Sequence, residues 1–274
     1  MLPLAAPGTS GLPAAKCPHV LTAHKVAEHH YAISVDDRSP GRLWWRSYGA
    51  DVSVTCVVLD IGGVLAVTPE TGWLQGWESE LGLAVGSTED RLAVIFERGS
   101  VGAMSEPEVQ AAVRAVLPVT DGDLERFWSL LWQDYLGSLN VELFAWFRGL
   151  RPRCSTGILS NGFVGARERE QERYGFQQAC DVVVYSHEVG VAKPDPEAYA
   201  LTARRLGACP EQIVLLDDTP VAIDGARAAG WHAVQFTATE QAIGDVEADL
   251  RDPGGEHEAE QGRKERPTDD RSAE

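Results

Sequence analysis

Three short apolar stretches of the sequence each end in polar side chains that could do chemistry. These side chains are Asp60, the pair Ser160–Asn161 and the pair Asp217–Asp218. Each stretch has the length and apolar composition of a buried parallel strand. In an open α/β sheet, ligands bind at the carboxyl ends of the strands. If the three strands are neighbours, three carboxylates, a hydroxyl and an amide therefore meet in one pocket.

A basic side chain joins this set, because Lys193 lies in the loop VAKPDP after another expected strand, DVVVYS. Three acids crowded together repel one another unless a cation joins them, so the set implies a divalent metal ion. A ligand set made only of oxygen atoms favours Mg²⁺. The hydroxyl, the ammonium group and the backbone N–H groups that follow Gly62 and surround Asn161 suit a phosphate bound beside that metal. A carboxylate that faces metal-bound phosphorus can attack it and form an aspartyl-phosphate, which water then hydrolyses.

The elements that must position these residues follow from the hydrophobic pattern. Residues 54–60 predict a buried strand, residues 71–149 show helical periodicity throughout, and strands and helices alternate from residue 156 onward. Repeated βα units predict a doubly wound parallel sheet with helices on both faces. The fold class is therefore α/β, with a helical module inserted after the first strand.

The domain organisation follows from the same pattern. We expect a core formed by 53–67 and 150–245, a helical insertion at 68–149, a weakly ordered N-terminal extension at 1–52 and a disordered polar tail at 246–274. The extension has no sustained hydrophobic period, and the tail is nearly free of large apolar residues.

Composition excludes several kinds of partner. The formal net charge is −17, from 24 Lys and Arg against 41 Asp and Glu, which disfavours nucleic acid and anionic membrane surfaces. No apolar run approaches the length of about 18 residues that a membrane span needs. Five dispersed cysteines without a CxxC pair indicate reduced thiols and a cytoplasmic location. A monomer and a homodimer both remain open.

Four stretches in order resemble motifs I to IV of the haloacid dehalogenase superfamily. They are VVLDIGGVL, GILSN, VAKPDPEAY and IVLLDDTPVAIDGARAAGW, within residues 54–236. The resemblance implies a Rossmann-like catalytic core whose first strand is central, and a small α-helical cap at 68–149 that closes over the site. By position, Asp60 matches the nucleophile of that superfamily, and Lys193 matches the residue that neutralises the charges of nucleophile and phosphate. Ser160 and Asn161 match the motif that holds the transferring phosphoryl group.

The resemblance also implies a metal site. The backbone carbonyl of Gly62 and the side chains of Asp60 and Asp218 match the family's Mg²⁺ ligands, with Asp217 close by. The backbone N–H groups of Gly62 and Gly63 are expected to help bind the phosphate.

Two positions depart from the pattern of the superfamily's phosphatases. Gly62 stands where those enzymes usually carry a second Asp, which protonates the leaving oxygen and later activates water. Such general acid–base help is typically worth about 10²–10⁴ in rate. Ala222 stands where an Asp or Asn usually supports the metal, and Asp224 lies two residues further on, where it should point elsewhere.

The sequence therefore predicts a Mg²⁺-dependent hydrolase that removes phosphate from a small phosphorylated metabolite, with sugar phosphates as one candidate class. Two alternatives remain open at this stage. A 2-haloacid dehalogenase also lacks the second Asp and attacks carbon without a metal, although the acid pair Asp217–Asp218 disfavours it. A catalytically reduced binding or regulatory protein of the same fold is the other, motivated by Gly62 and Ala222.

Overall fold

The structure is a computed structural model, and it describes residues 21–27, 30–35, 53–68 and 70–251. Two antiparallel strands, β1 (Leu21–Ala27) and β2 (His30–Val35), pair near the start of the chain. This hairpin lies within residues 1–52, where the hydrophobic pattern predicts no strand. The rest of the predicted N-terminal extension lies outside the described residues, as does the predicted tail from residue 252 onward.

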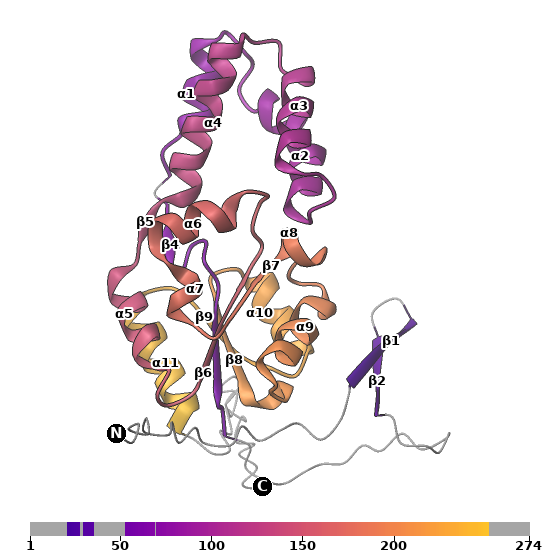
Figure 1. Ribbon diagram of the computed structural model, residues 1–274, viewed down its shortest axis with the longest axis vertical. Helices are drawn as coiled ribbons and strands as arrows, with labels where there is room; N and C mark the ends of the chain where they lie inside the picture. Colours follow the sequence, from indigo (N-terminus) through magenta and orange to yellow (C-terminus); the bar gives the residue numbers. More distant parts are fainter. Residues whose placement is uncertain (1–20, 28–29, 36–52, 69, 252–274) are drawn as a thin grey trace, which may run out of the picture.

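A five-stranded parallel sheet forms the centre of the fold (Figure 1). Its spatial order is β7 (Val182–Tyr185), β6 (Ser155–Ser160), β3 (Cys56–Leu59), β8 (Ile213–Asp217) and β9 (His232–Gln235). The first strand of the sheet along the chain, β3, lies in the middle and pairs with both β6 and β8. The doubly wound α/β fold and its central first strand are thus confirmed.

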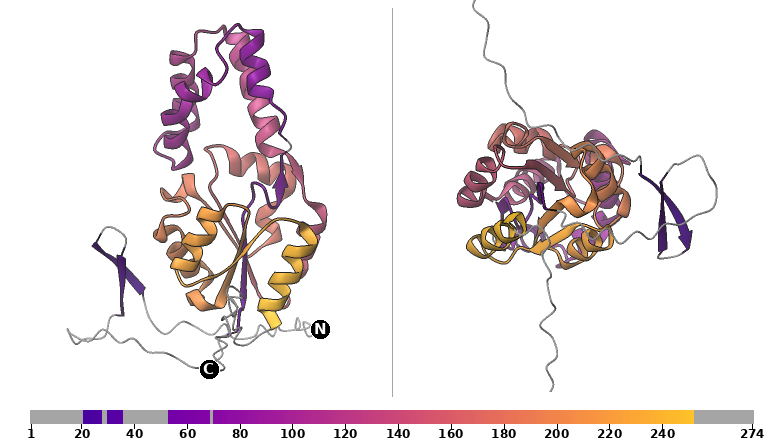
Figure 2. Two further views of the ribbon diagram at one scale, coloured as in Figure 1. Left: turned by 180° about the vertical axis from the view of Figure 1, so that it is seen from behind. Right: turned by 90° about the horizontal axis from the view of Figure 1, so that it is seen from below.

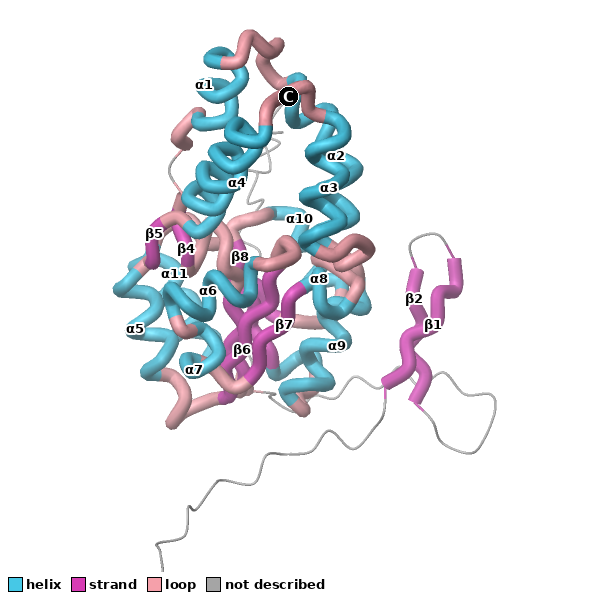
Figure 3. The backbone as a smooth tube through the Cα atoms, turned by 45° about the horizontal axis from the view of Figure 1, so that its top comes forward, coloured by secondary structure: helices cyan, strands magenta, loops and turns pink. Residues whose placement is uncertain are grey.

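Helices cover both faces of this sheet, because the side chains of each strand point alternately to its two faces. Val57 and Leu59 of β3 pack with α5 (Val141–Gly149), α7 (Phe176–Ala179) and α11 (Thr239–Arg251). Cys56 and Val58 point the other way, toward α9 (Pro196–Leu206) and α10 (Pro220–Ala228). Figure 3 shows the two groups of helices on either side of the strands.

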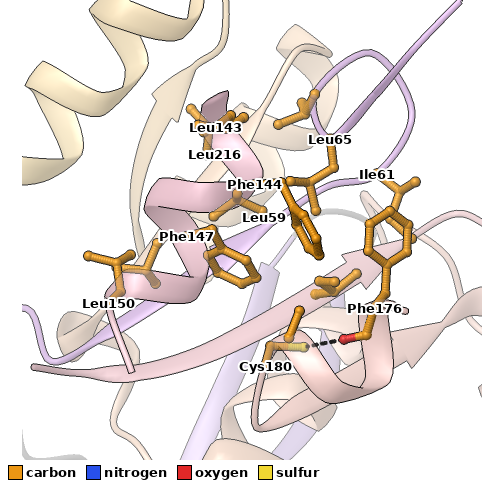
Figure 4. Packing of buried hydrophobic residues seen from close by; sticks show 14 of the residues in the cluster. Leu59, Ile61, Leu65, Leu143, Phe144, Phe147, Leu150, Phe176, Cys180 and Leu216 are labelled. Atoms are coloured by element: carbon orange, nitrogen blue, oxygen red, sulfur yellow. Dashed lines mark hydrogen bonds between the residues drawn. The ribbon is translucent and has the colours of Figure 1, made fainter. Parts of the chain in front are cut away.

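The boundary between core and cap differs from the predicted one. Helix α5 was expected at the end of the cap, but Leu143, Phe144 and Phe147 pack in the core cluster with Leu59 and Leu216 (Figure 4). Helical periodicity showed that α5 has an apolar face, but it did not show which surface that face covers. The cap therefore ends before residue 141.

The boundary between core and tail also lies later than predicted. Helix α11 continues to Arg251, six residues past the expected end of the core at 245. Val246 is fully buried in the core, and Trp146 of α5 donates a hydrogen bond from Nε1 to Glu247 Oε1 at 3.1 Å. These contacts hold the last turns of the helix against the fold.

The cap consists of four helices with an apolar core of their own. They are α1 (Trp73–Glu80), α2 (Ser87–Ser100), α3 (Glu106–Val116) and α4 (Asp121–Leu136). Trp77, Leu92, Val109 and Phe127 are buried in this cap core. The helices stand over one end of the sheet, as the view from behind also shows (Figure 2).

A short antiparallel ribbon joins cap and core on one side, formed by β4 (Ala66–Val67) and β5 (Ser138–Leu139). The remaining elements of the core are α6 (Ala166–Tyr174), α8 (Ser186–Val189) and the 3₁₀ turn Pro210–Gln212. Within the part of the chain that the structure describes, no helix combines the length and the apolar character needed to cross a membrane.

Candidate active site

The acids at the ends of two adjacent strands lie together. Asp60 follows β3 directly, and its backbone N–H donates to Leu216 O of β8 at 3.0 Å, one residue before Asp217. Parallel register therefore brings the two carboxylates side by side, and Asp218 follows at once. One carboxylate oxygen from each of Asp60, Asp217 and Asp218 lies within 4.8 Å of the other two.

Lys193 closes this group of acids. Its Nζ lies 2.9 Å from Asp60 Oδ1 and 2.5 Å from Asp217 Oδ2, and its side chain is only 3% exposed. The loop that carries it is fixed by Asn161, whose Oδ1 accepts from Lys193 N and whose Nδ2 donates to Lys193 O, both at 2.8 Å. The other oxygen of Asp217 accepts from Thr219 N at 2.9 Å. Both oxygens of Asp217 are therefore engaged by protein donors.

Burial and charge set the ionisation of the pair Asp60–Lys193. Burial raises the pKa of Asp60 above its ordinary value, and the ammonium of Lys193 partly offsets that effect. Burial alone would lower the pKa of Lys193, but the negative charges of Asp60 and Asp217 outweigh burial and raise it. The lysine is consequently held in its charged form beside the carboxylate.

Two glycines after Asp60 have different surroundings. A Cβ at Gly63 would lie 2.2 Å from Asp218 Oδ2, and its φ of +72° is one that side chains other than glycine rarely adopt. The turn after β3 can therefore approach Asp218 only because residue 63 has no side chain. A Cβ at Gly62 would meet no atom within 4 Å. Position 62 thus opens onto free space beside the nucleophile candidate.

Known proteins resemble this chain in sequence and in fold. The sequence profile of haloacid dehalogenase-like hydrolases matches residues 54–230. The chain belongs to the haloacid dehalogenase-like hydrolase family. A crystal structure of a HAD family enzyme from Bacteroides thetaiotaomicron, in complex with magnesium and inorganic phosphate, is similar in fold. Its TM-score is 0.58 at 18% identity, over 68% of this chain and 96% of that chain.

Curated relatives of this haloacid dehalogenase-like hydrolase include a phosphatase. Validoxylamine A 7'-phosphate phosphatase of Streptomyces hygroscopicus subsp. limoneus is 32% identical over 98 residues, which are 36% of this chain and 46% of that protein. Acyl-CoA dehydrogenase family member 10 of mouse is 26% identical over 228 residues, which are 79% of this chain and 21% of that protein. The chain thus spans less than half the length of these two relatives.

The structure of this haloacid dehalogenase-like hydrolase brings together four of the predicted site residues: Asp60, Lys193, Asp217 and Asp218. Ser160 is buried at the end of β6, beside β3. Asn161 follows it directly, in the loop that leaves β6, and its side chain is hydrogen-bonded to the backbone of Lys193.

The two positions after Asp218 that the sequence analysis singled out lie on α10. Ala222 is buried, and its carbonyl accepts a hydrogen bond from Tyr199 Oη at 2.8 Å. Asp224 is exposed and is not among the three acids that converge. The expectation that Asp224 points away from the site agrees with this arrangement.

Two polar residues near this region were not anticipated. Tyr135, at the end of cap helix α4, accepts a hydrogen bond at its Oη from Phe163 N at 3.3 Å. Glu170 of α6 is buried and accepts from Tyr185 Oη at 2.5 Å. No local spacing in the sequence could have revealed them, because each depends on a contact between separate elements.

Proposed function

We propose that the protein is a Mg²⁺-dependent phosphatase that acts on a small phosphorylated metabolite through an aspartyl-phosphate intermediate. The observation that carries the proposal is the buried arrangement of Asp60, Lys193 and the acid pair Asp217–Asp218 at the carboxyl end of the sheet. Membership of a hydrolase family supports hydrolysis as the type of reaction, and the phosphatase among the relatives favours a phosphate ester as substrate.

The acids fit a magnesium ion. Their ligand atoms are all oxygens, the donor type that Mg²⁺ prefers. Asp60 Oδ1 pairs with the Lys193 ammonium at 2.9 Å, but a carboxylate has lone pairs beyond that one contact, and the Asp218 carboxylate is exposed, so both residues have capacity for a cation. We assign Asp60, Asp218 and the backbone carbonyl of Gly62 as ligands. Asp217, whose oxygens are both engaged, would instead hold Lys193 beside this site.

When bound, Mg²⁺ would neutralise phosphate charge and make the phosphorus more electrophilic. The residues of the chain do the remaining work. Lys193 stabilises the negative charge of nucleophile and phosphate together. The Ser160 hydroxyl and the backbone N–H groups of Gly62 and Asn161 would bind the phosphoryl oxygens. The backbone N–H of Gly63, which the sequence also suggested for this role, instead donates to Ala66 O at 2.9 Å.

In the first step, a carboxylate oxygen of Asp60 forms a bond to phosphorus while the bond from phosphorus to the ester oxygen breaks. Gly62 offers no side chain to protonate that oxygen, so it takes its proton from water. Water then attacks the aspartyl-phosphate, which releases inorganic phosphate and regenerates Asp60. Without an acid at position 62, substrates with good leaving groups should react faster than simple alkyl phosphates.

The same acids disfavour dehalogenation. A 2-haloacid substrate carries a carboxylate, and the Asp218 carboxylate beside Asp60 would repel it unless a metal intervened.

The test uses p-nitrophenyl phosphate and a panel of metabolite phosphates, with Mg²⁺ and with EDTA, and 2-chloropropionate in parallel. We expect phosphate release that requires Mg²⁺ and is lost in Asp60→Asn. Halide release without metal, or no phosphate release from any substrate by folded protein, would overturn the proposal.

A further inference from the structure

Tyr135 is a cap residue whose side chain reaches from the cap core to the loops of the catalytic domain. Its ring packs edge-on against Trp132, with the centroids 5.4 Å apart. Its hydroxyl accepts a hydrogen bond from Phe163 N at 3.3 Å. Phe163 lies three residues after Ser160, in the loop that leaves β6 at the carboxyl end of the sheet. The ring is thus fixed by the cap, and the hydroxyl by the core.

The chain around Tyr135 is fastened to the loop that leaves Asp60. Three residues after Tyr135, strand β5 begins, and Leu139 pairs with Ala66 of β4. Asn140 N also donates to Leu65 O at 2.8 Å. The last turn of α4 is therefore held over the loops that follow both β3 and β6, on the side of the site that faces the cap.

Electrostatics agree with this position. Burial raises the pKa of Tyr135, and the negative charges of Glu170 and Asp60 raise it further. The hydroxyl thus keeps its proton throughout the neutral range. Among the residues that the structure describes, Phe163 donates to this hydroxyl but no group accepts its proton. Tyr135 Oη is therefore an anchored hydrogen-bond donor without a protein acceptor.

We infer that Tyr135 Oη donates a hydrogen bond to the ester oxygen of the substrate, the atom that leaves with the organic group. The inference rests on the proposed phosphatase function and gives the cap a direct part in it. The phosphoryl group would bind among the core loops, so the leaving group must point toward the cap, where this hydroxyl lies. Tyr135 keeps its own proton, and the departing oxygen still takes a proton from water. The tyrosine would thus stabilise charge that no side chain at Gly62 can neutralise.

The experiment compares wild type, Tyr135→Phe and a control, Tyr174→Phe, on aryl phosphates from p-nitrophenyl phosphate to phenyl phosphate. Tyr174 is a suitable control because its hydroxyl donates to Leu136 O at 2.8 Å and Gly137 O at 3.0 Å, between the end of α4 and β5. For Tyr135→Phe we expect kcat/KM to fall by about tenfold on phenyl phosphate and by much less on p-nitrophenyl phosphate, where less charge needs stabilising. Tyr174→Phe should show the wild-type dependence on leaving group.

The possible results separate the role of Tyr135 from the proposed phosphatase function. A wild type that hydrolyses these esters, with a Tyr135→Phe loss that is equal for every leaving group, would overturn the role of Tyr135 alone. The same holds if Tyr135→Phe behaves as wild type. No hydrolysis by folded wild type would overturn the proposed function and this inference with it. Thermal unfolding of each variant, compared with wild type, shows whether the cap remains folded.

Discussion

Lys193 Nζ lies 2.5 Å from Asp217 Oδ2, and the side chains of both residues are almost completely inaccessible to solvent. The same nitrogen lies 2.9 Å from Asp60 Oδ1. One ammonium group thus stands between a carboxylate that we assign to catalysis and one that is bound only by the protein. A buried ion pair of this kind is costly to break, because removal of one partner leaves the other charge uncompensated.

Asp217→Asn should destabilise the protein and lower its activity. The amide retains a polar contact to Lys193 but removes the charge, so we expect the free energy of unfolding to fall by about 3 kcal/mol. Urea unfolding measures this difference. The control is Asp224→Asn, an exposed residue of α10, whose partner Arg227 is 3.9 Å away and should contribute little. Equal stability of Asp217→Asn and wild type would contradict the role given to Asp217.

Glu170 should make stability depend on pH. Burial raises the pKa of Glu170 from 4.5 to about 7, so between these values the native state holds a proton that the unfolded state has lost. Stability must then decrease as pH rises through this window. Glu170→Gln removes the ionisation but can still accept from Tyr185. At pH 8 we expect the variant to be more stable than wild type by about 3 kcal/mol, with little difference at pH 4.5.

The control for this prediction lies on the same helix. Glu168 is exposed, so Glu168→Gln should not change the pH dependence of unfolding. If Glu170→Gln and wild type lose stability in parallel between pH 4.5 and pH 8, Glu170 is not the group that titrates.

An ion pair links the cap to the core. Arg169 Nη2 of α6 lies 2.7 Å from Glu106 Oε1 of cap helix α3. The Arg169 guanidinium also lies over the ring of Trp132 in cap helix α4, 4.0 Å from the ring centroid. Arg169→Gln removes both interactions, and we expect faster hydrogen exchange in α3 and a KM several-fold higher, as the cap closes less firmly. Stability should fall by about 1 kcal/mol. Arg167→Gln is the control, because its partner Glu188 belongs to the core. If both variants affect α3 equally, the ion pair to Glu106 does not hold the cap.

The sequence predicted the core and its acids because these depend on local pattern. A buried parallel strand that ends in Asp60 or Asp217 places that acid at the carboxyl edge of the sheet. The ends of adjacent strands meet at this edge, so the acids come together. The roles of Tyr135, Asn161 and Glu170 depend on contacts between elements that only the folded chain brings together. Hydrophobic periodicity also could not assign α5 to the core, since an apolar helix face packs equally well on a sheet or on other helices.

The final prediction concerns the two glycines after Asp60. A side chain at position 62 would enter open space, so Gly62→Asp should fold normally and place a carboxyl group beside Asp60. If that carboxyl acts as general acid, kcat on poor leaving groups should rise by about 10²-fold, with a smaller gain on p-nitrophenyl phosphate.

Gly63→Ala is the matched comparison, because its Cβ would collide with Asp218 and its φ is positive. It should lose most activity and require more Mg²⁺, since Asp218 must move away from Asp60 to make room. Steady-state kinetics across leaving groups and Mg²⁺ concentrations separate the two variants. A Gly62→Asp enzyme as impaired as Gly63→Ala would mean that position 62 is already filled by substrate, and that the organic group of the substrate occupies the space beside Asp60.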